Sequence, residues 1–130
     1  MSKKIVNTEK APSPVGPYNQ SIVVGGPMVF VSGQIALDPA TNTLVMDSIE
    51  EETHQVMKNV EAVLAANDCT MDNVVSCSVF VKDMEHYGQI NAVYGSYFKE
   101  DTAPTRALVE VSRLPKDVRV EVSAIAVKEV

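Results

Sequence analysis

The segment APTRALVEVSRLPKDVRVEVSAIAV, residues 103–127, decides the fold of this chain. Apolar side chains alternate with others on both sides of the connection SRLPKD, which predicts two β-strands joined by a short turn. Arg106 opens the first strand and Glu121 lies inside the second. Because arginine and glutamate are seldom buried, this pair is the first candidate for a functional site.

Each of these two strands has one uniformly apolar set of side chains. Residues two apart in a strand share a face of its sheet. The sets are Ala107, Val109 and Val111 in the first strand, and Val118, Val120, Val122, Ala124 and Ala126 in the second. We expect both sets to pack against helices, which places Arg106 and Glu121 together on the helix-free face.

Two interpretations of Arg106 and Glu121 remain open at this point. They form a structural ion pair, within the sheet or across a subunit contact, or they form a site for an anion. In a site, the planar guanidinium would hold a carboxylate through two hydrogen bonds, and the glutamate would orient or activate a water molecule. Spacing alone does not choose between the two.

The remaining elements follow from the sequence before this segment. Asp83 is placed to cap a helix with a regular apolar stripe, and the alternating residues 73–81 predict a strand before that helix. Ser48 and Glu51 form the S-x-x-E pattern that begins a helix, ahead of a second apolar stripe. Two strands joined at Gly-Gly-Pro, residues 25–27, come earlier. The predicted order is β-β-α-β-α-β-β.

This order predicts a single α+β domain over residues 1–130, long enough to bury a core. A strand-helix-strand crossover should be right-handed and should place both helices on one face of the sheet. The other face would then carry apolar side chains, among them Leu108, Ile125 and Val127. An uncovered apolar face of this kind predicts self-association.

Composition excludes several classes of protein. The chain has 17 acidic and 11 basic residues, a net charge of −6, which disfavours nonspecific binding to nucleic acid or to anionic membranes. No apolar run reaches membrane-spanning length, and the N-terminus lacks the apolar core of a signal peptide. Cys69 and Cys77 lack C-x-x-C spacing and are expected to be reduced structural thiols. We therefore expect a cytoplasmic protein.

Other candidate residues have weaker patterns. His54 and His86 lack the spacing of metal ligands, and Ser32 lies outside a G-x-S-x-G elbow. The acidic run Glu50-Glu51-Glu52 complements the positive end of a helix dipole, which explains it better than metal binding. Tyr18, in a proline-rich loop, is either a packing residue or a lid over a small site.

Four segments carry a resemblance to a known family: APSPVGPYNQ at 11–20, VSGQI at 31–35, VFVKDM at 79–84 and RALVEVSRLPKDVRVEVSAIAV at 106–127. Along essentially the whole chain the sequence resembles the Rid (YjgF-type) family, and specifically its RidA-type enamine/imine deaminases. The resemblance implies a chorismate-mutase-like homotrimer, with a six-stranded mixed sheet and two helices on one face in each subunit. It also implies sites in the clefts between subunits.

The implied activity is hydrolysis of short 2-imino acids, 2-iminobutanoate and 2-iminopropanoate. These form from enamines that pyridoxal-phosphate-dependent dehydratases release, and the products are a 2-keto acid and ammonia. No cofactor is implied. The resemblance also leaves room for a non-catalytic regulatory trimer that binds 2-keto acids, and less readily for an endoribonuclease or translation inhibitor.

The resemblance also assigns roles to individual residues. Arg106 matches the arginine that grips the substrate carboxylate, and Glu121 the glutamate that positions the attacking water. Tyr18 matches a tyrosine contributed by a neighbouring subunit, and Asn91 a helix asparagine near the ligand. The remaining substrate-binding positions are matched by Ser32, Gly33 and Leu108. Ser32 and Gly33 match positions that line the site through the backbone, whereas Leu108 replaces a cysteine that is common in the family.

Overall fold

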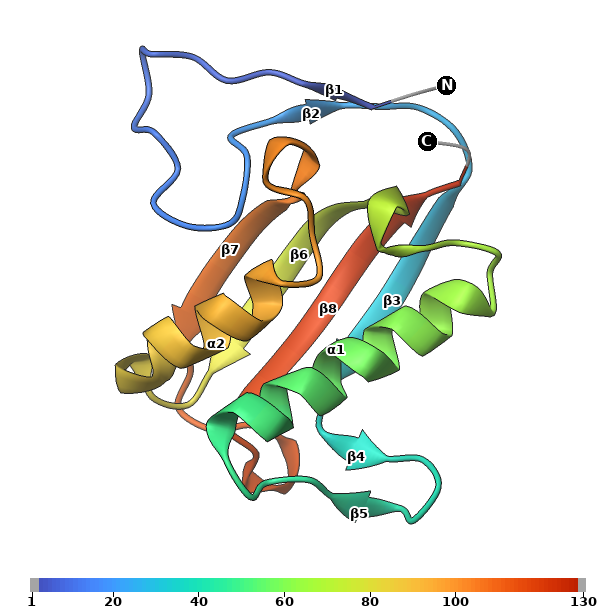
Figure 1. Cartoon of the computed structure of the whole chain (residues 1–130), viewed down its shortest axis with the longest axis vertical. Helices are drawn as coiled ribbons and strands as arrows, with labels where there is room; N and C mark the ends of the chain where they lie inside the picture. The colour runs from blue at the N-terminus through green and yellow to red at the C-terminus, as the bar shows by residue number, and fades with distance from the viewer. Residues whose placement is uncertain (1–2, 129–130) are drawn as a thin grey trace.

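A four-stranded sheet with two helices on one of its faces forms the centre of the molecule (Figure 1). The computed structural model describes residues 3–128. The strand order is β3-β8-β6-β7, with β6 and β7 parallel and the other pairs antiparallel. The strands are β3 (Met28–Gln34), β6 (Val74–Val81), β7 (Thr105–Glu110) and β8 (Val120–Val127).

Four further strands form two separate pairs outside this sheet. One pair lies near the N-terminus and the other follows β3. Their members are β1 (Lys4–Ile5) with β2 (Ile22–Val23), and β4 (Leu37–Asp38) with β5 (Thr43–Leu44). The mixed α+β fold is confirmed, but residues 3–128 do not show one continuous six-stranded sheet.

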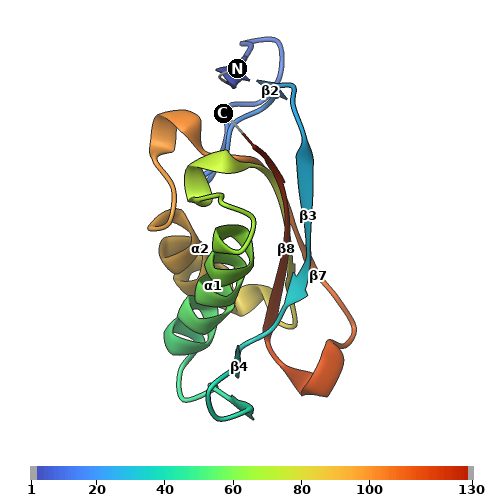
Figure 2. The same cartoon turned by 90° about the vertical axis from the view of Figure 1, so that its right-hand side faces the viewer.

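The first helix begins where the sequence predicts, whereas the second begins one short turn later than the predicted cap at Asp83. Helix α1 spans Ile49–Ala65, and the Ser48 side chain accepts a hydrogen bond from the Glu51 amide at 3.0 Å. Asp83 caps a short 3₁₀ turn, Met84–His86, that leads directly into α2 (Tyr87–Gly95). Figure 2 shows both helices on the same side of the sheet, with the other face uncovered in the described part of the chain. In residues 3–128 no helix is both long and apolar enough to cross a membrane.

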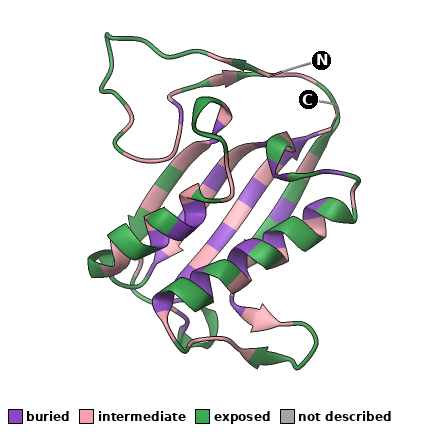
Figure 3. Cartoon of the chain, viewed as in Figure 1, coloured by how far each residue is buried: buried purple, intermediate pink, exposed green. Residues whose placement is uncertain are grey.

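The two strands of residues 103–127 are not neighbours in the sheet. Strand β6 lies between them, paired in parallel with β7 and antiparallel with β8. One face of β8 packs toward the helices, so buried and half-buried positions alternate along most of this strand in Figure 3. The buried set is the predicted one: Val120, Val122, Ala124 and Ala126.

The predicted orientation of β7 is wrong. Arg106 pairs with the buried Cys77 and Leu108 with the buried Val79, so Arg106 and Leu108 point toward the helices. Ala107 and Val109 point to the uncovered face and are exposed. The alternation correctly separated the two sets, but an apolar set identifies the helix-covered face only when the other face is left in water.

The uncovered face is nevertheless apolar. Its exposed residues include Phe30, which is 70% exposed, together with Met28 and Val109. Of the residues expected there from the sequence, Ile125 pairs with Phe30 on this face, whereas Val127 is only 2% exposed. The reason for expecting self-association therefore persists, although different residues supply it.

A buried ion pair joins α1 to the start of β8. Glu52 is fully buried, and its carboxylate accepts hydrogen bonds from Arg119 Nε at 2.6 Å and from the Arg119 amide at 2.8 Å. Arg119 also donates to the Met46 carbonyl at 2.9 Å. The acidic run of residues 50–52 therefore has a packing role that the helix dipole did not reveal. In the described residues no cluster of three or more His, Cys, Asp or Glu could hold a metal ion.

Replacing Glu52 should measure how strongly this pair stabilises the fold. Glu52→Gln leaves the Arg119 guanidinium without its buried countercharge, which should lower the free energy of unfolding by about 3 kcal/mol. Urea titrations of both proteins at one protein concentration would measure the difference. Glu50→Gln, at an exposed position of the same helix turn, is the control and should change it by less than about 0.5 kcal/mol. Equal losses in the two variants would contradict a special role for Glu52.

Candidate functional site

The guanidinium of Arg106 is held against the side of α2. Its Nη1 donates a hydrogen bond to Asn91 Oδ1 at 2.5 Å, and its Nη2 lies 3.5 Å from Tyr87 Oη as a weak second donor. Arg106 forms no ion pair within residues 3–128. The guanidinium has five N–H donors, so most of its hydrogen-bonding capacity remains available to a ligand.

Aromatic rings surround this cation. The guanidinium carbon lies 5.1 Å from the ring centre of Tyr94, 5.4 Å from that of Tyr18 and 6.0 Å from that of Tyr87. Rings at these distances attract a cation without neutralising its formal charge. The site therefore fixes Arg106 in place and leaves its positive charge for an anion.

The proline-rich loop closes over Arg106 from the same chain. A Cβ atom on Gly16 would lie 2.9 Å from Arg106 Nη2, so a side chain at this position would displace the guanidinium from its present place. Asn19 ties the loop down by donating to the Ala103 carbonyl at 2.8 Å. Tyr18 consequently reaches Arg106 of its own chain, which differs from the neighbouring-subunit placement that the resemblance implied.

Next to Arg106 is a pocket of about 250 Å³. Its lining combines the cation with apolar and aromatic side chains. The lining residues are Val15, Tyr18, Tyr87, Arg106 and Leu108. A small ligand with one anionic group and an otherwise apolar body would match this combination.

Glu121 lies on the other face of the sheet. It pairs with Phe80 in β6, and its carboxylate lies against Gly33, where a Cβ atom would overlap it. Gly33 and the exposed Ser32 lie where the pairing of β3 with β8 shifts register, between Val31 and Gln34. The bulge and the missing side chain together make room for the Glu121 carboxylate.

The register of β6 explains why Arg106 and Glu121 are separated. Arg106 pairs with Cys77 and Glu121 pairs with Phe80. Because Cys77 and Phe80 are three residues apart in one strand, they point to opposite faces of the sheet. The prediction that Arg106 and Glu121 share the helix-free face is therefore wrong, and the two do not form an ion pair within the chain.

A buried thiol and phenol lie beneath the guanidinium. Burial raises the pKa of Cys77 to about 11, although the neighbouring Tyr94 and the charge of Arg106 act in the opposite direction. Burial also raises the pKa of Tyr94, whose hydroxyl makes no hydrogen bond to nitrogen or oxygen in the described residues. Both groups are neutral at physiological pH, so Cys77 has the chemistry of a packing residue, not of a nucleophile.

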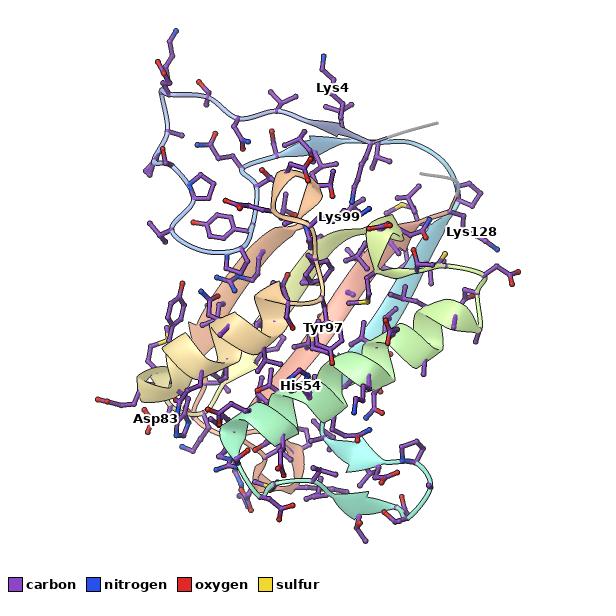
Figure 4. All side chains as sticks on the ribbon, viewed as in Figure 1. Lys4, His54, Asp83, Tyr97, Lys99 and Lys128 are labelled. Carbon is purple, nitrogen blue, oxygen red and sulfur yellow. The ribbon has the colours of Figure 1, made fainter. Side chains whose placement is uncertain are left out.

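The histidines take no part in this arrangement. His54 is exposed on α1, and its Nδ1 lies 2.9 Å from Tyr97 Oη, a pair that Figure 4 labels at the outer surface of the helices. His86 comes just before α2, and its Nδ1 is buried without a hydrogen-bond partner in the described residues. Neither histidine forms a hydrogen bond with Arg106 in residues 3–128.

Sequence reasoning missed three residues around Arg106: Gly16, Tyr87 and Tyr94. Both tyrosines lie in the helix that follows Asp83, for which the sequence predicts only a regular apolar stripe. Their spacing from Asn91, four residues before it and three after it, places all three on one helix face. An asparagine between two such tyrosines was the available signal that this face is not purely apolar.

Three comparisons relate the chain to known proteins. The family model described as endoribonuclease L-PSP matches residues 8–128. A RutC family protein of Synechocystis is 51% identical over 98% of both chains, and a 2-iminobutanoate/2-iminopropanoate deaminase of Salmonella typhimurium is 43% identical over 98% of this chain and 99% of its own. The crystal structure of Escherichia coli TdcF with bound serine is 39% identical, with a TM-score of 0.74 over 97% of this chain and 99% of that one.

These matches extend over nearly the whole chain and agree with the arrangement of sheet and helices seen in the structure. The chain therefore belongs to the Rid (YjgF-type) family, which the endoribonuclease L-PSP model describes.

Proposed function

We propose that this protein is a hydrolytic deaminase of short 2-imino acids, 2-iminobutanoate and 2-iminopropanoate. The observation that carries the proposal is the state of Arg106. It is a cation without an ion-pair partner in residues 3–128, held by Asn91 and aromatic rings at the edge of a small apolar pocket. A 2-imino acid offers such a site one carboxylate beside a short apolar side chain.

The reaction needs little beyond orientation. Arg106 would bind the carboxylate of the 2-imino acid. The imine carbon of this substrate is already electrophilic once the imine nitrogen is protonated. A water molecule placed by Glu121 adds to that carbon, and the carboxylate of Glu121 accepts the water proton. Glu121 returns this proton to the nitrogen of the resulting carbinolamine. The carbon–nitrogen bond then breaks, ammonia leaves, and the hydroxyl proton passes to Glu121 as the carbonyl group of the 2-keto acid forms. Holding water and imine together removes much of the entropic barrier.

A complete site requires a second copy of the chain, because Arg106 and Glu121 lie on opposite faces of one sheet. The Arg106 side of one subunit would meet the uncovered face of the next, the face that Glu121 shares with Phe30 and Val109. Such a contact joins two different surfaces, and contacts of this kind form a ring, not a twofold dimer, when the rotation between subunits closes. We propose a homotrimer with one site at each subunit contact.

Two relatives support this substrate class. The Salmonella protein is named for the proposed reaction, and the TdcF structure contains serine, an amino acid with an α-carboxylate. The net charge of −6 favours a small anion held by one recessed arginine over a nucleic acid, which requires extended basic surface. Endoribonuclease activity is therefore the weaker reading of the family description.

A non-catalytic role as a 2-keto-acid-binding regulatory trimer is the second candidate. The observation that favours it is that Leu108 lines the pocket, at the position where the resemblance to the family implies a cysteine. Both functions need Arg106, whereas only catalysis needs a water molecule activated by Glu121.

Light scattering would test the assembly. We expect a particle of three times the 14.1 kDa chain mass at micromolar concentration, because the apolar uncovered face is buried only on association. Phe30→Glu places a charge on that face and should shift the mass toward the monomer. A monomeric wild-type protein would contradict both the trimer and the shared site.

Substitutions at Arg106 and Glu121 would test the chemistry. Arg106→Ala should abolish binding of 2-oxobutanoate and hydrolysis of 2-iminobutanoate, and Arg106→Lys should restore little because an ammonium lacks the planar two-donor geometry. Glu121→Gln should retain binding and lose turnover. Hydrolysis can be followed with threonine dehydratase as the imine source and semicarbazide as the competing trap. Arg113→Lys, at an exposed site, is the control for the charge-conserving change and should keep full activity.

Mixed trimers provide a sharper test of sharing. When unfolded Arg106→Ala and Glu121→Gln chains are refolded together, about a quarter of subunit contacts should pair an intact Arg106 with an intact Glu121. Activity should therefore return in the mixture although each variant alone is inactive. No recovery in trimers shown to contain both chains would contradict sites built from two subunits.

Leu108→Cys would separate catalysis from simple binding. If Leu108 only lines the pocket, the change should alter hydrolysis by less than about tenfold, or about 1.4 kcal/mol in barrier height. Leu108→Ala is the matched control, because it removes the leucine bulk without adding a thiol. A much larger gain with cysteine than with alanine would show that the thiol matters and would favour the regulatory trimer for the natural chain.

A further inference from the structure

We infer that the Tyr87 hydroxyl is a second hydrogen-bond donor to the ligand carboxylate, beside Arg106. This inference rests on the proposed function in one respect, namely that Arg106 binds a carboxylate. Tyr87 would then act in ground-state binding and would set the orientation of the carboxylate. It would take no part in proton transfer.

The hydroxyl proton of Tyr87 has no acceptor among the described residues. Arginine has donors and no acceptor, so the contact of 3.5 Å between Arg106 Nη2 and Tyr87 Oη uses the tyrosine oxygen as acceptor. Within residues 3–128 this is the only hydrogen bond made by the Tyr87 hydroxyl. Its own O–H is therefore available, and Tyr87 lines the pocket beside Arg106 and Leu108.

The surroundings leave space for a ligand at this point. Nη1 of Arg106 is already turned toward Asn91, which fixes the plane of the guanidinium. A Cβ atom on Gly16 would lie 2.9 Å from Arg106 Nη2 and 3.3 Å from Tyr87 Oη, so a side chain at this position would crowd both groups, and glycine leaves that space free. A carboxylate has about four acceptor positions and can accept from the guanidinium and the phenol at once.

The two neighbouring tyrosines differ from Tyr87 in how their hydroxyls lie relative to the guanidinium. The Tyr94 hydroxyl is buried next to Cys77 and does not line the pocket. The Tyr18 hydroxyl accepts a hydrogen bond from the Val15 amide at 3.3 Å, so its proton is also free, but this hydroxyl makes no hydrogen bond to the guanidinium in residues 3–128. Of the three tyrosines around Arg106, only Tyr87 has a hydroxyl that is hydrogen-bonded to the guanidinium in residues 3–128.

Tyr87→Phe tests the inference, because it keeps the ring beside Arg106 and removes only the hydroxyl. We expect the apparent KM for 2-iminobutanoate and the Kd for 2-oxobutanoate each to rise about tenfold, as for loss of a hydrogen bond to a charged group. The kcat should stay within about twofold, which is the pattern of lost uniform binding. Tyr97→Phe, which removes the hydroxyl bonded to His54, is the matched control and should change neither constant.

A neutral ligand would distinguish loss of a hydrogen bond to the carboxylate from a general change in the shape of the pocket. The loss on Tyr87→Phe should be clearly smaller for 2-oxobutanamide than for 2-oxobutanoate, since the amide carries no negative charge. Unchanged KM and Kd would overturn the inference, as would equal losses for the two ligands or a fall in kcat alone. Melting temperatures of both variants would confirm that they are folded.

The same measurements separate this inference from the proposed function. A wild-type protein that binds 2-oxobutanoate but does not hydrolyse the imine would overturn the deaminase, while the Kd values would still decide the role of Tyr87. Binding that depends on Arg106 but not on Tyr87 would overturn the inference alone. A wild-type protein that binds no 2-oxobutanoate would overturn both.

Discussion

The register of β6 against its two neighbours is the constraint on which the rest of the site depends. Strand β6 pairs Cys77 with Arg106 on one side and Phe80 with Glu121 on the other. Since a strand alternates its faces residue by residue, an odd separation sends the two charged side chains to opposite faces. A shift of one residue in either pairing would bury one of these charges or place the two together. The separation of Arg106 from Glu121 is thus a property of the backbone pairing.

Arg106 can remain charged without an ion-pair partner in residues 3–128, because aromatic rings surround it and its side chain is only partly buried. Asn91 supplies a neutral acceptor, and the rings of Tyr18, Tyr87 and Tyr94 place their negative faces near the cation. A carboxylate in place of Asn91 would form an ion pair with Arg106. The carboxylate of a ligand would then gain little binding free energy from the arginine. The neutral cage therefore orders the side chain while preserving its capacity to bind an anion.

How far the sequence alone predicted this structure can be judged from particular residues. The capped helix at Ser48, the strand of residues 74–81 and the buried set of β8 followed from local periodicity and capping, which are properties of short segments. The face to which Arg106 points did not. Alternation separates two sets of side chains but does not say which set the helices cover, and the apolar uncovered face removes the usual clue.

The site residues divide along the same line. The strand pattern singled out Arg106, the proline-rich loop pointed to Tyr18, and the resemblance added Asn91 and Leu108. The structure brings these residues together without deciding their roles. Gly16, Tyr87 and the buried Glu52–Arg119 pair were missed, because each depends on contacts between segments far apart in the chain. Such contacts leave no periodic trace in sequence.

The buried ion pair also bears on where Glu121 is held. Glu52 fixes Arg119 through both its side chain and its backbone amide, one residue before β8 begins. Glu121 follows two residues later, next to the bulge at Gly33 that leaves room for its carboxylate. Helix α1 therefore anchors the end of β8 that carries Glu121, while α2 anchors Arg106 at the far edge of the sheet. Each helix positions one half of the proposed site, and the halves can meet only when two chains associate.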